Sequence, residues 1–329
     1  MSVNFGLPYM GSKSKIAADL IRLIPSGERF VDVFAGGCAM THAAMLTGRW
    51  KEYLANDITG TPEFFVDVMN GKYNGENRWI SREDFFRLKD SDPFVRFCFS
   101  FGNNGKDYIY SQTIEPYKKA CHYVVFFDDW TDFQGLCPEV YMSVKKALEG
   151  IKDIKQRRLM LGPAVIGALK TINRPDIVKK NPLYNSCHKK MVHGTNPDAT
   201  YLESLERLER LERLESLESL QNLEGLDGNV HTRKGDYRTL EVKPGDVLYC
   251  DPPYKGTAGY NGQEFDHEAF YDWACSQTVP VYISEYSMPA DRFLKIWEKK
   301  AVSRLSQKGT EGYACECLFV PRKRIIKNI

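Results

Sequence analysis

Short apolar runs separated by glycine, proline and polar residues lie near both ends of the chain. Residues 30–34 form an apolar, β-favouring run, the turn Ala35-Gly36-Gly37 follows, and residues 40–46 have the spacing of a helix start with Thr41 near its cap. Strand, glycine turn and helix in this order are typical of the first βα unit of a doubly wound sheet. The pattern therefore predicts an α/β fold that binds its ligand at the carboxyl ends of the strands.

A second apolar run, residues 52–55, ends in Asn56-Asp57. An acid at the tip of the second strand of such a sheet is well placed to accept hydrogen bonds from ribose hydroxyls. The glycine turn by itself is compatible with a dinucleotide, a nucleoside or a purely structural turn. The absence of a third glycine at the usual offset argues against the dinucleotide fingerprint.

A third apolar run, residues 247–250, ends in Asp251-Pro252-Pro253-Tyr254. Proline has no N–H and forces the residue before it into an extended conformation, so a rigid spur is expected at the end of this strand. The Asp251 carboxylate and the Pro252 carbonyl are then acceptors for one primary amine, such as the exocyclic amino group of a nucleobase. Tyr254 offers an aromatic face on which a planar base can stack. A proline-stiffened loop would explain the rigidity, but not the acid and the aromatic residue on either side of the prolines.

The composition adds few constraints on the class of protein. The 329 residues are 43% hydrophobic and 27% charged, and no apolar run approaches the roughly 18 residues of a membrane span. With no signal-like segment at the start, a cytoplasmic protein without a membrane partner is expected. The nine cysteines are predicted to be reduced, and Cys315 and Cys317 to pack in the core, with no metal bound.

The charge is uneven along the chain. From Lys145 to Lys190 there are twelve Lys or Arg residues and three acidic residues, although the net charge of the whole chain is only +2. Such an excess attracts a polyanion such as DNA, but solvated helix faces can also carry it.

A leucine repeat follows the basic stretch, in YLESLERLERLERLESLESLQNLEGL. A period of three is shorter than the 3.6-residue helical turn, so the leucines wind around a helix instead of forming one stripe. Glu203 with Arg207 is one of several favourable i,i+4 pairs, and one long helix is expected at about 200–224. This helix is interpreted as a spacer or elongated structural helix, since repeat slippage in the gene produces the same pattern without a selected function; a spiral contact surface or a self-association site is the alternative.

Four segments taken together carry a resemblance to a known family: PYMGSKSKI near the start, DVFAGG, the strand-end ND and YCDPPY far downstream. The chain resembles the Dam-type (D12 class) DNA adenine-N6 methyltransferases. The resemblance implies a Rossmann-like S-adenosylmethionine-dependent methyltransferase fold, with a catalytic domain of residues 1–60 and 235–329. It also implies an inserted, mainly helical DNA target-recognition region, residues 61–234, which contains the basic stretch and the leucine repeat.

The resemblance assigns roles to individual positions. Asp251, Pro252 and Tyr254 match the catalytic motif. The positions that match cofactor-binding motifs are Tyr9, Gly11, Lys13, Asp32, Phe34, Gly36, Gly37, Asp57, Asp236 and Tyr237. Cys38 stands where the family's FxGxG motif has its last glycine, which is a departure from the pattern.

Residues expected to contact double-stranded DNA come from two segments. Residues 92–108 resemble the segment that leads into the recognition region, and the others belong to the basic stretch. The DNA-binding candidates are Asn103, Asn104, Lys106, Arg157, Arg158, Lys179, Lys180, Lys189 and Lys190.

The expected reaction transfers a methyl group to the amino group of an adenine that has been flipped out of the duplex, with Tyr254 stacking on the base. Related enzymes that act on cytosine N4 more often begin this motif with serine, and those that act on RNA or protein glutamine with asparagine, so Asp251 favours adenine. A DNA-binding module that has lost activity and a nucleotide-dependent oxidoreductase are the alternatives from other classes, and the latter leaves the Asp-Pro-Pro-Tyr segment unexplained.

Overall fold

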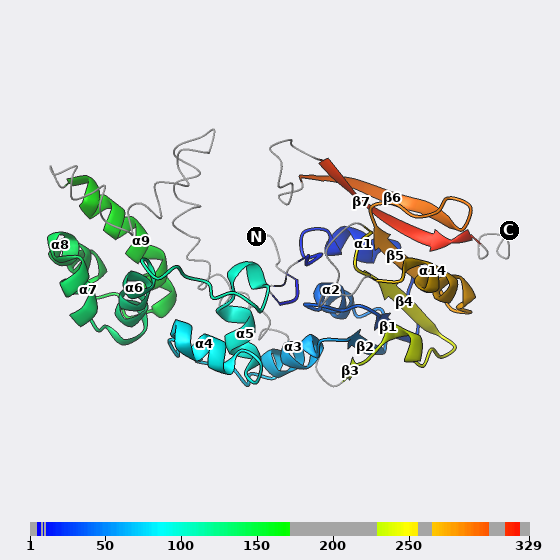
Figure 1. The fold of residues 1–329 in the computed structure, drawn as a ribbon, viewed down its shortest axis with the longest axis horizontal. Helices are drawn as coiled ribbons and strands as arrows, with labels where there is room; N and C mark the ends of the chain where they lie inside the picture. Colours follow the sequence, from blue (N-terminus) through cyan, green and yellow to red (C-terminus); the bar gives the residue numbers. More distant parts are fainter. Residues whose placement is uncertain are drawn as a thin grey trace. The chain divides into compact units, whose positions relative to one another are not determined.

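The computed structural model describes residues 5–7, 9, 11–171, 229–255, 265–302 and 313–322 (Figure 1). The leucine repeat and Lys179, Lys180, Lys189 and Lys190 lie outside these residues, so the expectations for them stay predictions. The chain divides into two compact units. Unit 1 is Met1–Tyr73 with Leu217–Ile329, and unit 2 is Asn74–Ser216.

Unit 1 is a mixed α/β structure built on a sheet whose seven described strands have the order β3-β2-β1-β4-β5-β7-β6 (Figure 1). Strands β1 to β5 pair in parallel, whereas β7 is antiparallel to both β5 and β6. The strands are β1 (Arg29–Asp32), β2 (Glu52–Asp57), β3 (Val230–Lys234), β4 (Asp246–Cys250), β5 (Val281–Glu285), β6 (Phe293–Val302) and β7 (Tyr313–Pro321).

The central strands are apolar because both faces of the sheet are covered. Every residue of β4 is buried, as parallel strands between helices require. Side chains alternate between the faces of a strand: Val31 packs in one core with Phe270 of α14 (His267–Ser276), whereas Phe30 packs against Trp50, with ring centres 5.0 Å apart. The predicted runs 30–34 and 247–250 thus correspond to the two central strands.

The helix after the glycine turn is α2 (Ala39–Thr47), which follows α1 (Ala17–Leu23) and precedes α3 (Thr61–Met69). Its start differs from the expected capping by Thr41, because no side chain caps α2. The backbone N–H and the hydroxyl of Thr41 instead donate to Asp32 Oδ2, at 3.1 and 2.8 Å. Thr41 therefore ties α2 to the end of β1.

The expected domain boundaries require a correction. Residues 61–234 were assigned to the insertion, but α3 packs against β2 and β3, and β3 pairs with β2 from Tyr53↔Val230 to Asp57↔Lys234. Both elements therefore belong to unit 1. A strand on the edge of the sheet cannot be separated from the domain whose hydrogen bonds it completes.

Unit 2 is helical in its described part, with a core formed by α6 to α9. Amphipathic spacing produces this core, since Val124, Phe133, Val140 and Val144 are all fully buried or nearly so. The helices are α4 (Arg82–Leu88), α5 (Pro93–Cys98), α6 (Glu115–Phe127), α7 (Thr131–Leu136), α8 (Pro138–Leu148) and α9 (Ile154–Thr171). Within the described ranges, no helix combines the length and apolarity needed to cross a membrane.

Candidate active site

Acidic residues lie at the carboxyl ends of four neighbouring parallel strands. Asp32 ends β1, Asp57 ends β2, Asp251 follows β4 and Glu285 ends β5. The parallel registers of β1 with β2 and with β4 bring these ends to the same edge of the sheet. This is the edge at which open α/β sheets bind their ligands.

Asp251 forms an ion pair with Lys13, which comes from the start of the chain. Lys13 Nζ lies 2.9 Å from Asp251 Oδ2, and the two side chains are only 10% and 18% exposed. The exposed Gly11 lies two residues before Lys13, and its carbonyl is 3.5 Å from Lys13 Nζ. The other oxygen of Asp251, Oδ1, is buried and has no hydrogen-bond partner in the described part of the chain. The next residue, the buried Pro252, has no N–H that could donate to this oxygen. Asp251 Oδ1 therefore remains an acceptor.

Burial and the ion pair have opposing effects on the pKa values of Asp251 and Lys13. Burial raises the pKa of Asp251, and the charge and hydrogen bond of Lys13 lower it in part. Burial alone would lower the pKa of Lys13, but the negative charges of Asp251 and Glu316 outweigh it and the net shift is upward. Lys13 is therefore a cation at neutral pH, and it favours the ionised form of Asp251.

Tyr254 is enclosed by three neighbours. Lys13 Nζ lies 4.6 Å from the centre of its ring, and the ring of Tyr286 meets it nearly edge-on, with centres 4.5 Å apart and an angle of 81°. The hydroxyl of Tyr254 donates a hydrogen bond of 2.8 Å to Glu316 Oε2. The catalytic candidates Asp251 and Tyr254 and the cofactor candidate Lys13 are thus brought together.

The glycine turn packs against Tyr9. A Cβ on Gly37 would lie 2.6 Å from Tyr9 Cβ, and one on Gly36 would lie 3.0 Å from the Tyr9 ring. Only glycines allow this close approach. Cys38, at the position where the resemblance expects glycine, adopts φ +60° and ψ +30°, a left-handed conformation that glycine tolerates best.

Asp57 holds this turn in place. Its Oδ2 accepts a 2.9 Å hydrogen bond from the Gly36 N–H, and its Oδ1 accepts one of 2.8 Å from the Thr59 N–H. The acid that was predicted to bind ribose is therefore also a structural link between the ends of β1 and β2.

Asp32 is fully buried at the end of β1. Its Oδ2 accepts both hydrogen bonds from Thr41, while Oδ1 has no hydrogen-bond partner among the residues that the structure describes. Burial raises the pKa of Asp32 to about 7, against the opposing effect of the Thr41 hydroxyl. Asp32 therefore changes its charge close to neutral pH.

Phe34 and Tyr237 lie together in a group of aromatic rings. Their ring centres are 5.3 Å apart, and both contact Phe265, at 5.8 and 5.9 Å. Asp236 begins the short 3-10 turn Tyr237–Thr239 and forms an ion pair of 2.6 Å with Arg238. The structure thus brings two predicted cofactor residues into contact, while Asp236 binds its own neighbour.

Three residues at this edge were missed by sequence reasoning: Glu285, Tyr286 and Glu316. Glu285 is 2% exposed, accepts hydrogen bonds from the backbone N–H groups of Tyr286 and Lys255, and has its pKa raised to about 7 by burial. The sequence does contain an indication of the two acids, because each stands within an apolar strand, in YISEY and ECLFV. A carboxylate in such a strand requires a partner.

In unit 2, Asn103 ends the 3-10 turn Phe101–Asn103, and Asn104 and Lys106 lie in the loop that follows. The Asn104 side chain accepts hydrogen bonds from the backbone of Lys106 and Asp107, at 2.8 and 3.0 Å, and so shapes the loop. Asn103 has φ +57°, and its buried Oδ1 has no hydrogen-bond partner in the described ranges. Lys106 is exposed.

The structure corrects the expectation for Arg157 and Arg158, which are 7% and 5% exposed. The Arg157 guanidinium donates to the carbonyls of Val124 and Ile151 and pairs with Asp128. Arg158 lies over the ring of Phe126, at 5.8 Å. Both arginines join α9 to α6, so they are not available to the DNA backbone.

A groove in unit 2 has a cavity volume of about 640 Å³ and a wall formed by Trp79. Its two cations face acids, since Arg82 lies 3.7 Å from Glu115 and Lys119 lies 4.0 Å from Asp132. The groove therefore has no marked excess of either charge.

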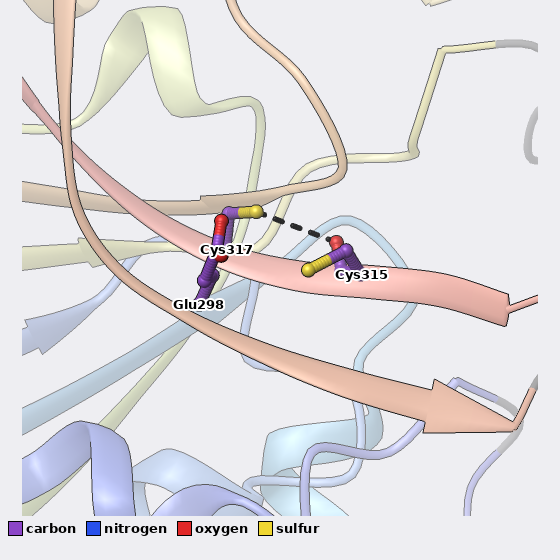
Figure 2. A group of neighbouring side chains, drawn as sticks. All are labelled: Glu298, Cys315 and Cys317. Atoms are coloured by element: carbon purple, nitrogen blue, oxygen red, sulfur yellow. Dashed lines mark hydrogen bonds between the residues drawn. The ribbon is translucent and has the colours of Figure 1, made fainter.

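A second group of side chains lies on the outer strand pair of the sheet (Figure 2). The ligand atoms of Glu298, Cys315 and Cys317 lie within 4.8 Å of one another, which is close enough to hold a metal ion. Lys295, however, already pairs with Glu298, and both thiols pack against the core that contains Phe293. These contacts explain why the three side chains lie together as structural parts of the sheet.

The seven-stranded α/β sheet with a glycine turn and an Asp-Pro-Pro-Tyr segment at its carboxyl edge is consistent with a methyltransferase fold. The family model described as D12 class N6 adenine-specific DNA methyltransferase matches residues 9–70. The match covers the segment from Tyr9 to α3, which includes Lys13, the glycine turn and Asp57. A comparison with curated proteins gave no match. The matched family points to DNA adenine methylation.

Proposed function

We propose that the protein is a site-specific DNA adenine-N6 methyltransferase that uses S-adenosylmethionine and acts on an adenine flipped out of double-stranded DNA. The observation that carries the proposal is the partly buried Asp251 directly after β4, with one oxygen on Lys13 and the other, buried oxygen without a partner among the described residues. The aromatic ring of Tyr254 follows three positions later and lies beside the same lysine. An acceptor and a stacking surface side by side are what a nucleobase amine requires.

The residues at the carboxyl edge fit S-adenosylmethionine, which carries a positive sulfur and an amino group. Asp32 has a buried carboxylate oxygen, Oδ1, to which the structure gives no partner within its described part. Phe34 and Tyr237 supply aromatic surface for the adenine of the cofactor. Asp57 Oδ2 accepts from the Gly36 N–H and has a second lone pair with which it can accept a ribose hydroxyl.

When bound, S-adenosylmethionine supplies a methyl group already activated by its positive sulfur, so that group needs no further activation from the protein. Asp251 accepts a hydrogen of the adenine amino group through Oδ1, and the Pro252 carbonyl accepts the other. Both contacts favour a nitrogen lone pair that points at the methyl carbon. The methylated amine would carry a surplus N6 proton, which Asp251 would accept and pass to water.

The Rossmann-like assignment of unit 1 and the assignment of unit 2 as the inserted target-recognition region complete the proposal. Asn103, Asn104 and Lys106 stand on one loop of unit 2 and combine two amides with an exposed cation. Amides read base edges and lysines contact phosphates, so this loop suits DNA. Self-association through the leucine repeat remains a separate prediction.

The test is to express the protein in a bacterium that lacks DNA methylation and to sequence its DNA by a single-molecule method that detects N6-methyladenine. Modified adenine in a defined motif is expected with the wild type and not with Asp251→Ala. Binding of S-adenosylmethionine to the purified variant, measured by calorimetry, shows that its fold is intact.

Unmodified adenine with folded, cofactor-binding wild type would contradict the proposal. Modified cytosine N4 or modified RNA would then indicate the other amino-methyltransferases. A protein that binds DNA but no cofactor would indicate a silent module.

A further inference from the structure

The hydroxyl of Tyr254 is bound by a residue far along the chain. Glu316 lies on β7, which pairs with β5, and its Oε2 accepts the phenol hydrogen at 2.8 Å. Burial, with the nearby charges of Asp251 and Glu316, raises the pKa of Tyr254 well above its ordinary value. The phenol therefore remains a hydrogen-bond donor at neutral pH.

The orientation of Glu316 follows from the alternation of β7. Cys317 faces the hydrophobic core, and Cys315 packs against that core, so Glu316 between them points to the opposite face. On that face it meets Tyr254, and its charge also raises the pKa of Lys13. A half-buried carboxylate thus lies beside the proposed catalytic segment without being part of it.

The phenol has one hydrogen and two acceptors within reach. The Tyr254 hydroxyl also lowers the pKa of the Asp251 carboxyl, which is therefore a second acceptor close to it. In the structure the phenol hydrogen is directed to Glu316, and Asp251 Oδ1 has no partner among the described residues. Since a hydroxyl can donate only one hydrogen, Glu316 keeps it away from the acceptor that the adenine amine needs.

We propose that Glu316 is a positioning residue that acts through the Tyr254 hydroxyl. It fixes the ring, which Tyr286 packs against at 81°, and it leaves Asp251 free to accept the amine. The inference rests on the proposed methyltransferase function. It adds a residue of the last strand to the machinery that binds the target base.

The test is a double-mutant cycle with Tyr254→Phe, Glu316→Ala and the double variant, measured as the single-turnover methylation rate. Each single change is expected to lower the rate about tenfold, as expected for a lost hydrogen bond to a charged group. The double variant is expected to lose about tenfold as well, because both changes remove the same interaction. Glu316→Gln keeps an acceptor and should retain activity within about threefold of the wild type.

Two readouts distinguish positioning from a loss of folding. Fluorescence of 2-aminopurine at the target base should report weaker stacking in Glu316→Ala, while S-adenosylmethionine affinity stays unchanged. Glu268→Ala removes an exposed acid from α14 and serves as the matched control, with wild-type rate expected.

Losses that multiply to about a hundredfold in the double variant would overturn the inference, because the two residues would then act independently. Equal losses in Glu316→Gln and Glu316→Ala would also overturn it, since charge and not the hydrogen bond would matter. A wild-type protein that methylates no DNA overturns the proposed function, and this inference with it, whereas multiplying losses in an active enzyme overturn this inference alone.

Discussion

The ammonium of Lys13 lies 2.9 Å from the Asp251 carboxylate and 4.6 Å from the centre of the Tyr254 ring. One cation from the start of the chain therefore contacts both proposed catalytic side chains. Its charge lowers the pKa of a carboxyl whose pKa burial raises, and so favours the ionised form of Asp251.

Replacing Lys13 with methionine should raise the pKa of Asp251 and so reduce the ionised fraction at a given pH. The expected result is a single-turnover methylation rate lower by about tenfold at neutral pH, with the acid limb of the pH–rate profile moved to higher pH. Lys15→Met removes an exposed lysine two positions away and should leave both unchanged. An unshifted acid limb in Lys13→Met would show that Lys13 does not control Asp251.

Asp32 predicts a pH dependence of stability. Its pKa is raised from 3.8 to about 7 by burial, so the folded state binds more protons than the unfolded state between these values. The stability that this provides is fully present below about pH 4 and is lost as the pH rises through about 7. Between about pH 5 and about pH 7, the free energy of unfolding should fall by roughly 2 kcal/mol from this group alone.

Asp32→Asn is the variant that checks this, because an amide resembles the protonated acid and can still accept from Thr41. Urea unfolding at several pH values should show a flatter dependence for Asp32→Asn than for the wild type. Parallel curves for the two proteins would rule out Asp32 as the source.

Cys38 is expected to tolerate glycine better than a branched side chain, because its φ is +60°. Cys38→Gly removes a buried thiol but relieves the left-handed strain, so its free energy of unfolding should stay within about 1 kcal/mol of the wild type. Cys38→Val should cost more than about 2 kcal/mol. Denaturant unfolding compares the three proteins, and an equally stable valine variant would contradict the observed turn.

Arg157 and Lys106 should behave differently towards DNA. Arg157→Met breaks the contacts with Val124, Ile151 and Asp128 and should lower the free energy of unfolding by about 2 kcal/mol, with no change in the salt dependence of DNA binding. Lys106→Ala should leave stability nearly unchanged and lower the slope of log affinity against log salt by about one. Filter binding at several salt concentrations measures the slope, and the reverse pattern would restore Arg157 as a phosphate contact.

Local signals predicted the strands and the helix that carry the site, because apolar alternation, glycines and prolines act within a few residues. Lys13 with Asp251, and Phe34 with Tyr237, could be grouped because each belongs to a recognisable motif. The Tyr254–Glu316 contact could not, since it depends on the antiparallel pairing of β5 with β7. The burial of Arg157 could not be predicted either, because a run of basic residues does not show which of them faces the α6 helix.

The chain leaves unit 1 after Tyr73 and returns to it at Leu217, and the next described strand is β3, the outermost strand on that side of the sheet. The pairing of β1 with β4, which positions Asp32 and Asp251, therefore contains no residue of unit 2. Evolution can lengthen, shorten or exchange unit 2 without altering the register of these central strands. With unit 2 as the proposed target-recognition region, a chain built in this way can acquire a new DNA specificity while its proposed chemistry stays unchanged.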